Sequence, residues 1–229
     1  MKKSSSKNWE KIYFEGKQLN RYPYDFVVSF VFRKFSAVPL AERKKVKILD
    51  LGCGAGNNAK FLAENGFSVY GVDCSETVIK ICKKRFKGLR LEGKFIKCEF
   101  TKLPFKDNYF DLIIDRESLY ANYLSDINKT VKEVYRVLKN DGELLSLMYN
   151  NFHPDIKLGK NVEDNTFRNF SEKSTFHQTG IVHFITQQEI KKVFFQFKIK
   201  NIMRHSLKGV FNKKNNFMEF DEYIIIAKK

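Results

Sequence analysis

Apolar and polar positions along the chain predict strands that alternate with amphipathic helices. Seven short apolar runs predict strands, at residues 46–51, 68–73, 94–99, 110–115, 143–149, 198–207 and 222–227. Segments with the apolar spacing of helices separate the first five strands. Between Ile127 and Leu138, for example, apolar residues recur every three or four positions. This alternation predicts a parallel sheet with right-handed crossovers and helices on both faces.

Local signals mark the ends of several expected helices. Ser75 can cap a helix that we expect to stop at Gly88, and the helix after the first strand should end at Asn65-Gly66. Near the C-terminus, "TQQE" is a capping box ahead of another helix, and only a loop joins the two strands that follow. We therefore expect an α/β, doubly wound, seven-stranded sheet that is mostly parallel and has an antiparallel C-terminal hairpin.

A glycine-rich loop, "ILDLGCGAG", follows the first strand directly. Parallel sheets bind ligands beyond the carboxyl ends of their strands, so this loop is a candidate binding site. A dinucleotide fingerprint, G-x-G-x-x-G, would need glycine where Asn57 stands. Asp73 ends the second strand, where a carboxylate can accept hydrogen bonds from both hydroxyls of a ribose. We therefore expect a ligand with a free ribose, although Asp50 could be a loop residue and Asp73 a helix cap.

These residues resemble the class I S-adenosylmethionine-dependent methyltransferases, from about residue 46 to the C-terminus. "ILDLGCGAG" is similar to the first motif of that superfamily and "VYGVDCSE" to the second. "CEFTKLPFKDNYFDLIID" resembles the stretch with the third and fourth, and "EVYRVLKNDGELL" the approach to the fifth strand. Four motifs in order are a specific match. The resemblance implies a Rossmann-like fold, S-adenosyl-L-methionine as cofactor and S-adenosyl-L-homocysteine as product.

The resemblance also implies roles for residues around the glycine loop. Gly52 and Gly54 let the backbone approach the methionine end of the cofactor, whose carboxylate lies near helical N–H groups at Asn57 and Asn58. Asp50 meets the ammonium group, directly or through water. Further expected cofactor contacts are Cys53, Asp73, Cys74, Ser75, Glu99, Phe100, Asp115, Tyr13 and Arg21.

Adenine recognition is implied for Glu99 and Phe100. Glu99 lies where the superfamily most often has Asp, which accepts from the adenine amino group, and Phe100 lies beside the ring. The extra methylene of Glu makes its contact the least certain. Cys53 and Cys74 lie inside motifs, where we expect backbone contacts rather than thiol chemistry.

Residues 1–45 resemble the N-terminal helical cap of small-molecule methyltransferases with a W-x-x-x-Y pattern, here Trp9 and Tyr13. These aromatic residues could equally be helix packing. Arg21 and Tyr22 lie ahead of an expected helix at 24–35. The guanidinium could hold the methionine carboxylate or an anionic substrate, or make a surface salt bridge.

The chain should form a single domain of 229 residues. Residues 46–149 are the expected cofactor-binding core and 185–229 the C-terminal helix and hairpin. Residues 150–184 lack periodicity and follow the fifth strand at the ligand edge, so we expect an acceptor-site insertion or lid. Its phenylalanines argue against a disordered loop.

Acceptor chemistry is expected after the fourth strand, in "IIDRESLYANY". Asp115 could be a general base or orient one, and Arg116 could hold an anionic group, or the two could pair with each other. His153 is a further catalytic candidate, although isolated histidines are usually structural. The full set of substrate candidates is Tyr22, Arg116, Tyr120, His153, His177 and His183.

The formal charge of +16 permits a polyanionic partner such as RNA, but the lysines are dispersed along the chain, as an overall residue bias would leave them. The favoured interpretation is a methyltransferase for a small, anionic metabolite, such as a sugar nucleotide or a phosphorylated or surface-glycan intermediate. The alternatives are an RNA or protein methyltransferase and a non-catalytic S-adenosylmethionine-binding protein.

Cellular context follows from what the sequence lacks. No apolar stretch approaches the roughly 18 residues of a membrane span, and no apolar run follows the basic start. The four cysteines, at 53, 74, 82 and 98, have no C-x-x-C spacing, which argues against a metal site or a disulfide framework. We expect a cytoplasmic protein without a metal, and the oligomeric state stays open.

Overall fold

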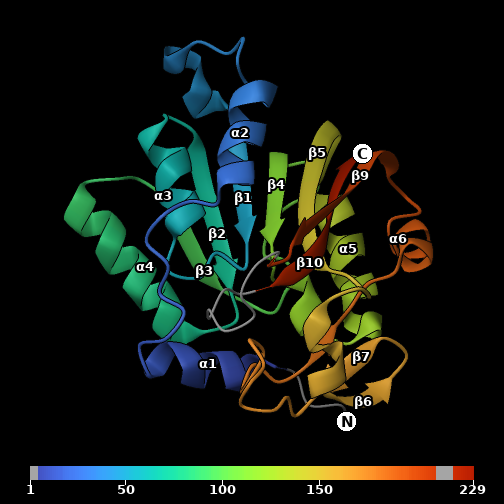
Figure 1. Cartoon of the computed structure of the whole chain (residues 1–229). Coiled ribbons are helices and arrows are strands. Elements are labelled where there is room, and N and C mark those ends of the chain that lie inside the picture. Colours follow the sequence, from blue (N-terminus) through green and yellow to red (C-terminus); the bar gives the residue numbers. More distant parts are fainter. Residues whose placement is uncertain (1–4, 210–218) are drawn as a thin grey trace.

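A seven-stranded sheet forms the centre of the computed structural model, which describes residues 5–209 and 219–229 (Figure 1). Its strands are β1 (Lys47–Leu51), β2 (Ser68–Asp73), β3 (Lys94–Lys97), β4 (Phe110–Arg116), β5 (Leu138–Tyr149), β9 (Lys198–Leu207) and β10 (Phe220–Lys228). They are ordered β3-β2-β1-β4-β5-β10-β9. The first five strands pair in parallel, and β10 runs antiparallel to both β5 and β9. The predicted mostly parallel sheet with its antiparallel C-terminal pair is confirmed.

Helices cover both faces of this sheet. On one face α2 (Asp25–Lys34), α3 (Asn57–Glu64) and α4 (Glu76–Leu89) pack on a core that includes Ile48 and Leu112. On the other face α5 (Leu124–Val137) and α6 (Gln187–Val193) pack on a core that includes Leu49 and Ile113. The side chains of adjacent residues in one strand therefore pack into opposite cores, because successive side chains of a strand point to opposite faces of the sheet.

The end of α4 differs from the prediction. The helix passes through Gly88 and ends one residue later, where Arg90 takes a left-handed conformation with φ +55°. The N–H of Leu91 then donates to the Phe86 carbonyl at 3.0 Å, the pattern that closes many helices. The helix does not need glycine to stop, because Arg90 adopts the left-handed turn itself. At the end of α3, Gly66 has φ +83° as expected.

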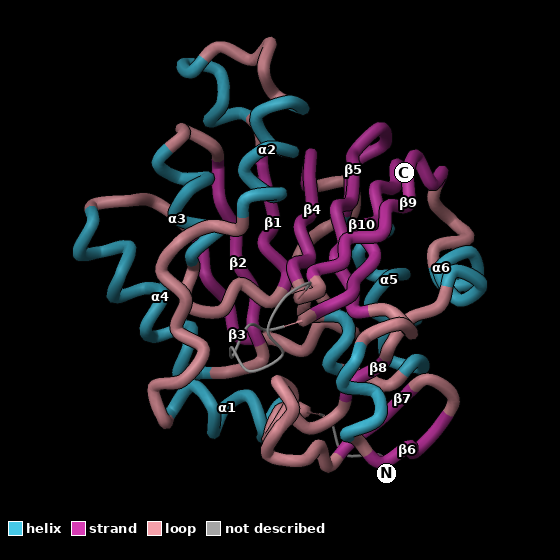
Figure 2. The backbone as a smooth tube through the Cα atoms, viewed as in Figure 1, coloured by secondary structure: helices cyan, strands magenta, loops and turns pink. Residues whose placement is uncertain are grey.

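The carboxyl ends of the parallel strands are covered by two segments that are far apart in sequence (Figures 1 and 2). One is α1 (Ser6–Phe14). The other is the segment after β5, which contains the 3₁₀ turn η3 (Pro154–Leu158) and the strands β6 (Lys160–Glu163), β7 (Thr166–Arg168) and β8 (Val182–His183). Two further 3₁₀ turns are η1 (Leu40–Lys45) and η2 (Leu119–Ala121).

The insertion at residues 150–184 is a small folded unit. Its three strands form a separate antiparallel sheet, β6-β7-β8, and its side chains form a core with Phe170, Phe176 and Phe184 against Tyr120. The sequence showed no periodicity here because these strands are only two to four residues long. No helix in the described ranges is long and apolar enough to cross a membrane.

Candidate functional site

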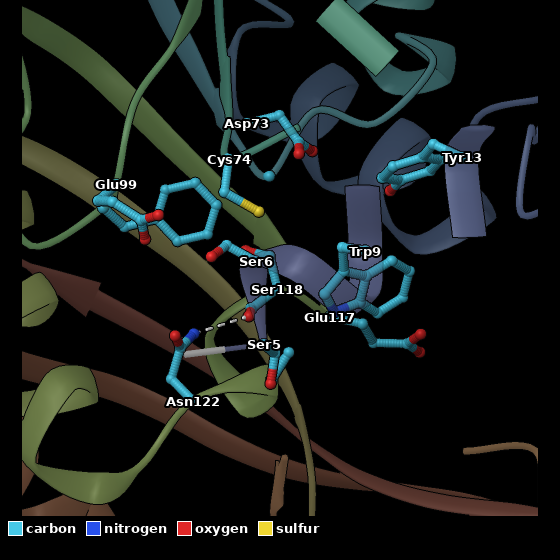
Figure 3. Close-up of a pocket in the computed structure, with 13 residues that line it drawn as sticks. Ser5, Ser6, Trp9, Tyr13, Asp73, Cys74, Glu99, Glu117, Ser118 and Asn122 are labelled. Carbon is cyan, nitrogen blue, oxygen red and sulfur yellow. Dashed lines mark hydrogen bonds between the residues drawn. The ribbon is translucent and has the colours of Figure 1, made fainter. Parts of the chain in front are cut away.

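Two adjoining pockets lie at the carboxyl edge of the sheet. The inner pocket lies between α1, the glycine loop, the ends of β2 and β3, and the turn after β4. Figure 3 shows its lining, which is Ser5, Ser6, Trp9, Tyr13, Gly52, Asp73, Cys74, Glu99, Phe100, Glu117, Ser118, Ala121 and Asn122. The expected contacts Tyr13, Asp73, Cys74, Glu99 and Phe100 are thus brought together.

The glycine loop is shaped by a close approach of the turn after β4. Gly52 has φ +72°, and a Cβ there would lie 2.2 Å from the Cβ of Ser118. The N–H groups of Gly52 and Cys53 both donate to the Val72 carbonyl, at 2.8 and 2.9 Å. Any side chain at position 52 would therefore push apart the two loops that form the floor of the inner pocket.

Asp73 presents its carboxylate at the inner pocket (Figure 3). One oxygen accepts from the Gly54 N–H and the other from the Ser75 N–H, both at 3.0 Å. The N–H and the thiol of Cys74 also donate to this carboxylate. Burial raises the pKa of Asp73 to about 6.

Asp50 and Ser75 do not line either pocket. Asp50 is buried beneath the glycine loop, where desolvation raises its pKa to about 7 and its Oδ2 has no hydrogen-bond partner. Ser75 is the N-cap of α4 and accepts from the Val78 N–H at 3.2 Å. Its hydroxyl donates to Glu10 of α1 at 2.6 Å. Ser75 is thus used inside the fold, whereas Asp50 keeps one oxygen without a partner. The cofactor contacts expected at Ser75 and, directly or through water, at Asp50 stay predictions.

The outer pocket lies between the α1–α2 linker, the glycine loop, the end of β4 and the insertion. Asn57 and Asn58 line it, but their side chains already fix the linker. Asn57 Nδ2 donates to the Tyr22 carbonyl at 2.9 Å, and Asn58 Oδ1 accepts from the Tyr24 N–H at 3.1 Å. The other expected residues in its wall are Tyr13, Arg21, Tyr22, Cys53, Gly54, Arg116, Tyr120 and His153.

Asp115 is fully buried and lines neither pocket. Its Oδ1 accepts from the N–H groups of Ser118 and Leu119 at 3.0 and 3.1 Å, and its Oδ2 accepts from the Ser146 hydroxyl at 2.5 Å. These hydrogen bonds hold the turn after β4. The expected roles of Asp115, as a general base, as a residue that orients one or as a cofactor contact, stay predictions.

Arg116 lies in the wall of the outer pocket, but its partner is not Asp115. Its guanidinium pairs with Glu117 and stacks over the Tyr24 ring, 4.2 Å from the ring centroid. The Nε atom of Arg116 is buried without a partner. The charge that we expected to bind an anion is thus balanced within the protein.

Glu117 was missed by sequence reasoning, although it stands inside the stretch that we singled out. It lines both pockets, and its Oε2 accepts from the Tyr149 hydroxyl at 2.6 Å as well as from Arg116. Burial raises the pKa of Glu117 to about 7, against the opposing effect of Arg116. Asp115, Arg116 and Glu117 are consecutive charged residues, and the sequence does not indicate which of them faces the pockets.

The three candidate histidines differ in position. His153 lines the outer pocket, its Nδ1 accepts from the Asp155 N–H at 3.1 Å, and desolvation lowers its pKa to about 4. It is therefore a neutral imidazole at physiological pH. His177 and His183 line neither pocket, and their expected substrate roles stay predictions. His183 is fully buried with Nδ1 2.8 Å from the Thr166 hydroxyl, and Nδ1 of His177 lies 3.2 Å from the Phe170 carbonyl, outside both pockets.

Other lining residues also escaped prediction. Ser118, Asn122, Tyr149 and Phe176 come from loops and from the end of β5, where no motif marks them. The only available signal was the proximity of Ser118 and Asn122 to the fourth strand. All four cysteines are free, and burial raises the pKa of Cys74, so this lining residue stays a thiol.

A family model described as a methyltransferase domain matches residues 42–199. The chain belongs to this methyltransferase family. A relative from Geobacillus sp. (strain WCH70), which is named as a methyltransferase, is 34% identical to this chain over 146 residues. The match covers 62% of this chain and 58% of the relative. The demethylmenaquinone methyltransferase of Thermus thermophilus is 34% identical over 116 residues, 49% of this chain and 52% of the relative. The chain spans about half the length of these relatives.

Solved structures share the methyltransferase fold. An S-adenosylmethionine-dependent methyltransferase from Methanosarcina mazei has a TM-score of 0.67 at 24% identity, covering 80% of this chain and 92% of its own. The 1,6-didemethyltoxoflavin-N1-methyltransferase of Burkholderia thailandensis, solved with S-adenosylhomocysteine, has a TM-score of 0.64 at 17% identity, covering 98% and 86%. The W-x-x-x-Y cap of this methyltransferase stays a prediction.

The pockets fit the cofactor of the family, S-adenosylmethionine. Asp73 offers a buried carboxylate at the pocket wall to a ribose, and Phe100 offers a ring beside Glu99 for an adenine. The buried, unpartnered Oδ2 of Asp50 lies under the loop expected to hold the methionine end. An unpaired buried acceptor is costly, so a donor supplied by a bound ligand or its water would stabilise this arrangement.

Proposed function

We propose that this methyltransferase moves the methyl group of S-adenosylmethionine to a small molecule bound in the outer pocket. The observation that carries the proposal is the shared wall of the two pockets. Trp9, Tyr13, Gly52 and Glu117 line both. An acceptor in the outer pocket therefore reaches a cofactor methyl group presented from the inner one, and alignment alone can supply roughly 7 to 11 kcal/mol of the barrier.

The cofactor roles proposed for individual residues follow the pocket walls. Asp73 binds the ribose hydroxyls, and Glu99 and Phe100 hold the adenine. Gly52 and Gly54 leave room for the methionine end, and Arg21 lies within the wall where a carboxylate group would emerge. Bound S-adenosylmethionine supplies an electrophilic methyl carbon, and the protein supplies alignment.

Aromatic side chains support a small acceptor. Tyr149 lies 4.8 Å from Tyr120, 4.9 Å from Phe176 and 5.0 Å from His153, measured between ring centroids. These rings, with Trp9, make an apolar wall under the roof formed by α1 and the insertion. Such a site suits a compact molecule better than an RNA or protein segment.

The expected anionic character of the acceptor is supported only at the pocket mouth. Arg116 is neutralised by Glu117, whereas Arg21 lies on the linker with Tyr22, which is 82% exposed. We propose that any phosphate of the acceptor, as in a sugar nucleotide or a phosphorylated or glycan intermediate, lies beside Arg21. The reacting end lies deeper, among the aromatic rings.

The test combines cofactor binding with turnover. Calorimetry should show that S-adenosylhomocysteine binds the wild-type protein. Incubation with S-adenosylmethionine and a panel of small alcohols, amines and acids should then release S-adenosylhomocysteine. Absence of binding would refute the proposal, whereas binding without release from any acceptor would favour the non-catalytic alternative.

A further inference from the structure

We propose that Glu117 takes the proton from the methyl acceptor, so that the acceptor reacts through an N–H or O–H group and not through a carboxylate. This inference rests on the proposed function and assigns the chemistry of the same site. The role of general base is thereby assigned to Glu117 and not to Asp115, which lines neither pocket.

Only one of the two carboxylate oxygens of Glu117 accepts hydrogen bonds from the described residues. Both of its hydrogen bonds, from Arg116 and from the Tyr149 hydroxyl, end on Oε2. Within residues 5–209 and 219–229, no group donates to Oε1. One oxygen therefore fixes the side chain, and the other is available to a ligand where the two pockets meet.

The backbone holds Glu117 in this position under strain. Its φ of +53° lies in the left-handed region, which non-glycine residues seldom occupy outside constrained sites. Its N–H donates to the Leu147 carbonyl at 3.1 Å, and Asp115 secures the following turn through the N–H groups of Ser118 and Leu119. Asp115 is thus a positioning residue for Glu117.

The charges around Glu117 suit a proton acceptor near neutral pH. Arg116 beside it stabilises the carboxylate, whereas Glu222 of β10 and Asp115 of β4 oppose its ionisation. Tyr149 of β5 donates to it, and Tyr24 and Tyr120 are the other titratable groups close by. Since burial outweighs the arginine, the pKa of Glu117 rises to about 7, which suits general base catalysis at physiological pH.

Methyl transfer to the acceptor is coupled to the loss of one proton from it. The acceptor nitrogen or oxygen lone pair forms a bond to the methyl carbon, and the carbon–sulfur bond breaks with its electron pair left on sulfur. The acceptor proton passes to Oε1, so Glu117 becomes a neutral acid and later returns the proton to water. A carboxylate acceptor has no proton to give, and it would add a negative charge against Glu117 in a site shielded from water.

Binding of three matched probes tests the acceptor class without knowledge of the natural substrate. The protein loaded with S-adenosylhomocysteine is titrated with benzylamine, benzyl alcohol and benzoate. Trp9 reports binding, because it lines both pockets and is the one tryptophan of the chain. The amine and the alcohol should bind more tightly than benzoate at pH 8, and Glu117→Gln should remove this discrimination.

Kinetics with an acceptor found by the release assay tests the proton transfer. Glu117→Gln should lower kcat by about 10² to 10⁴ fold and abolish the loss of activity at acid pH, while S-adenosylhomocysteine affinity is kept. Glu64→Gln, an exposed change on α3, should behave as the wild type. Tighter benzoate binding, no binding of the amine, or wild-type kcat in Glu117→Gln would overturn the inference alone. Failure of S-adenosylhomocysteine to bind the wild type would overturn the proposed function as well.

Discussion

Asp73 and Asp115 are buried carboxylates at the ends of two strands of the same sheet, yet they are used differently. Asp73 accepts donors from Gly54, Cys74 and Ser75 and still faces the inner pocket. Asp115 accepts donors from Ser118, Leu119 and Ser146 and faces neither pocket. A carboxylate at a pocket wall can bind a ligand, whereas one enclosed in the fold stabilises structure.

Asp73→Asn should weaken the binding of S-adenosylhomocysteine tenfold or more. The change removes charge from two proposed hydrogen bonds to the ribose, and each bond to a charged group is worth about 1.5 to 3 kcal/mol. Calorimetry on the folded variant measures the effect. Asp141→Asn, at an exposed residue outside both pockets, is the matched control, and unchanged affinity in Asp73→Asn would remove Asp73 from the site.

Asp115→Asn should mainly destabilise the fold. The amide places an N–H₂ group against donors that now meet a carboxylate oxygen, and a buried unsatisfied donor costs about 1 to 3 kcal/mol. Urea unfolding should show a loss of that size, with Asp126→Asn on the exposed part of α5 as the control. If stability is kept, the carboxylate of Asp115 does not hold the turn after β4.

The residue scale also shows where sequence reasoning reaches its limit. The ligand-facing position of Asp73 was predictable because a motif and a strand end coincide there. The burial of Asp115 was not, because one of its donors, Ser146, is 31 residues away on β5. The exposure of Glu117 to the pockets depends on the left-handed backbone conformation of that residue, and no local sequence pattern predicted this conformation.

At the scale of elements, α1 forms part of the pocket wall and is fastened in its middle and at its N-cap. Glu10 accepts from the hydroxyls of Ser75 and Thr77 at 2.6 and 2.5 Å, which joins α1 to the start of α4. On the insertion side, Ser5 Oγ accepts from the Ile181 N–H at 2.9 Å. The helix thus bridges the cofactor-binding core and the insertion (Figure 1).

Glu10→Gln should speed the release of S-adenosylhomocysteine. The variant replaces two charge-assisted hydrogen bonds with neutral ones, so α1 opens more often, and a loss of about 1 kcal/mol raises the dissociation rate roughly fivefold. Stopped-flow fluorescence of Trp9 follows the release. Glu15→Gln, whose carboxylate is paired with Lys17 near the end of the same helix, is the control. Equal rates for both variants would show that Glu10 does not hold the helix.

Element prediction succeeded where length and periodicity were sufficient. All seven strands of the central sheet were found, and so was the capping box that starts α6, where Thr186 and Glu189 bond reciprocally. The small sheet of the insertion was missed because strands of two to four residues are too short to show alternation. Its stability comes instead from the packing of Phe170, Phe176 and Phe184.

At the scale of the whole molecule, four buried acids make the ligand-free protein sensitive to pH. Burial raises the pKa of Asp50 to about 7, of Asp73 to about 6 and of Glu117 to about 7, and it also raises the pKa of Asp115. A raised acid pKa means that the folded state binds protons more tightly than the unfolded chain. The stability from this source is therefore complete below the unfolded pKa values near 4 and is lost as pH rises through about 6 to 7. His153 acts in the opposite direction, because its lowered pKa of about 4 costs stability as pH falls from 6.5 to 4.

The melting temperature of the ligand-free protein should accordingly fall between pH 5 and pH 8, and Asp50→Asn should reduce that fall. Asp50 contributes most because its pKa rises from 3.8 to about 7, equivalent to about 4 kcal/mol as an upper bound. The neutral amide avoids that cost at pH 8, so its melting temperature should exceed the wild-type value by several degrees. At pH 5 the difference should be less than half as large, because pH 5 lies closer to the unfolded pKa of 3.8 than to the folded pKa of about 7. Thermal unfolding at a series of pH values provides the measurement, with Asp126→Asn as the control. A melting temperature that rises from pH 5 to pH 8, or an Asp50→Asn curve parallel to wild type, would show that Asp50 does not titrate in this range.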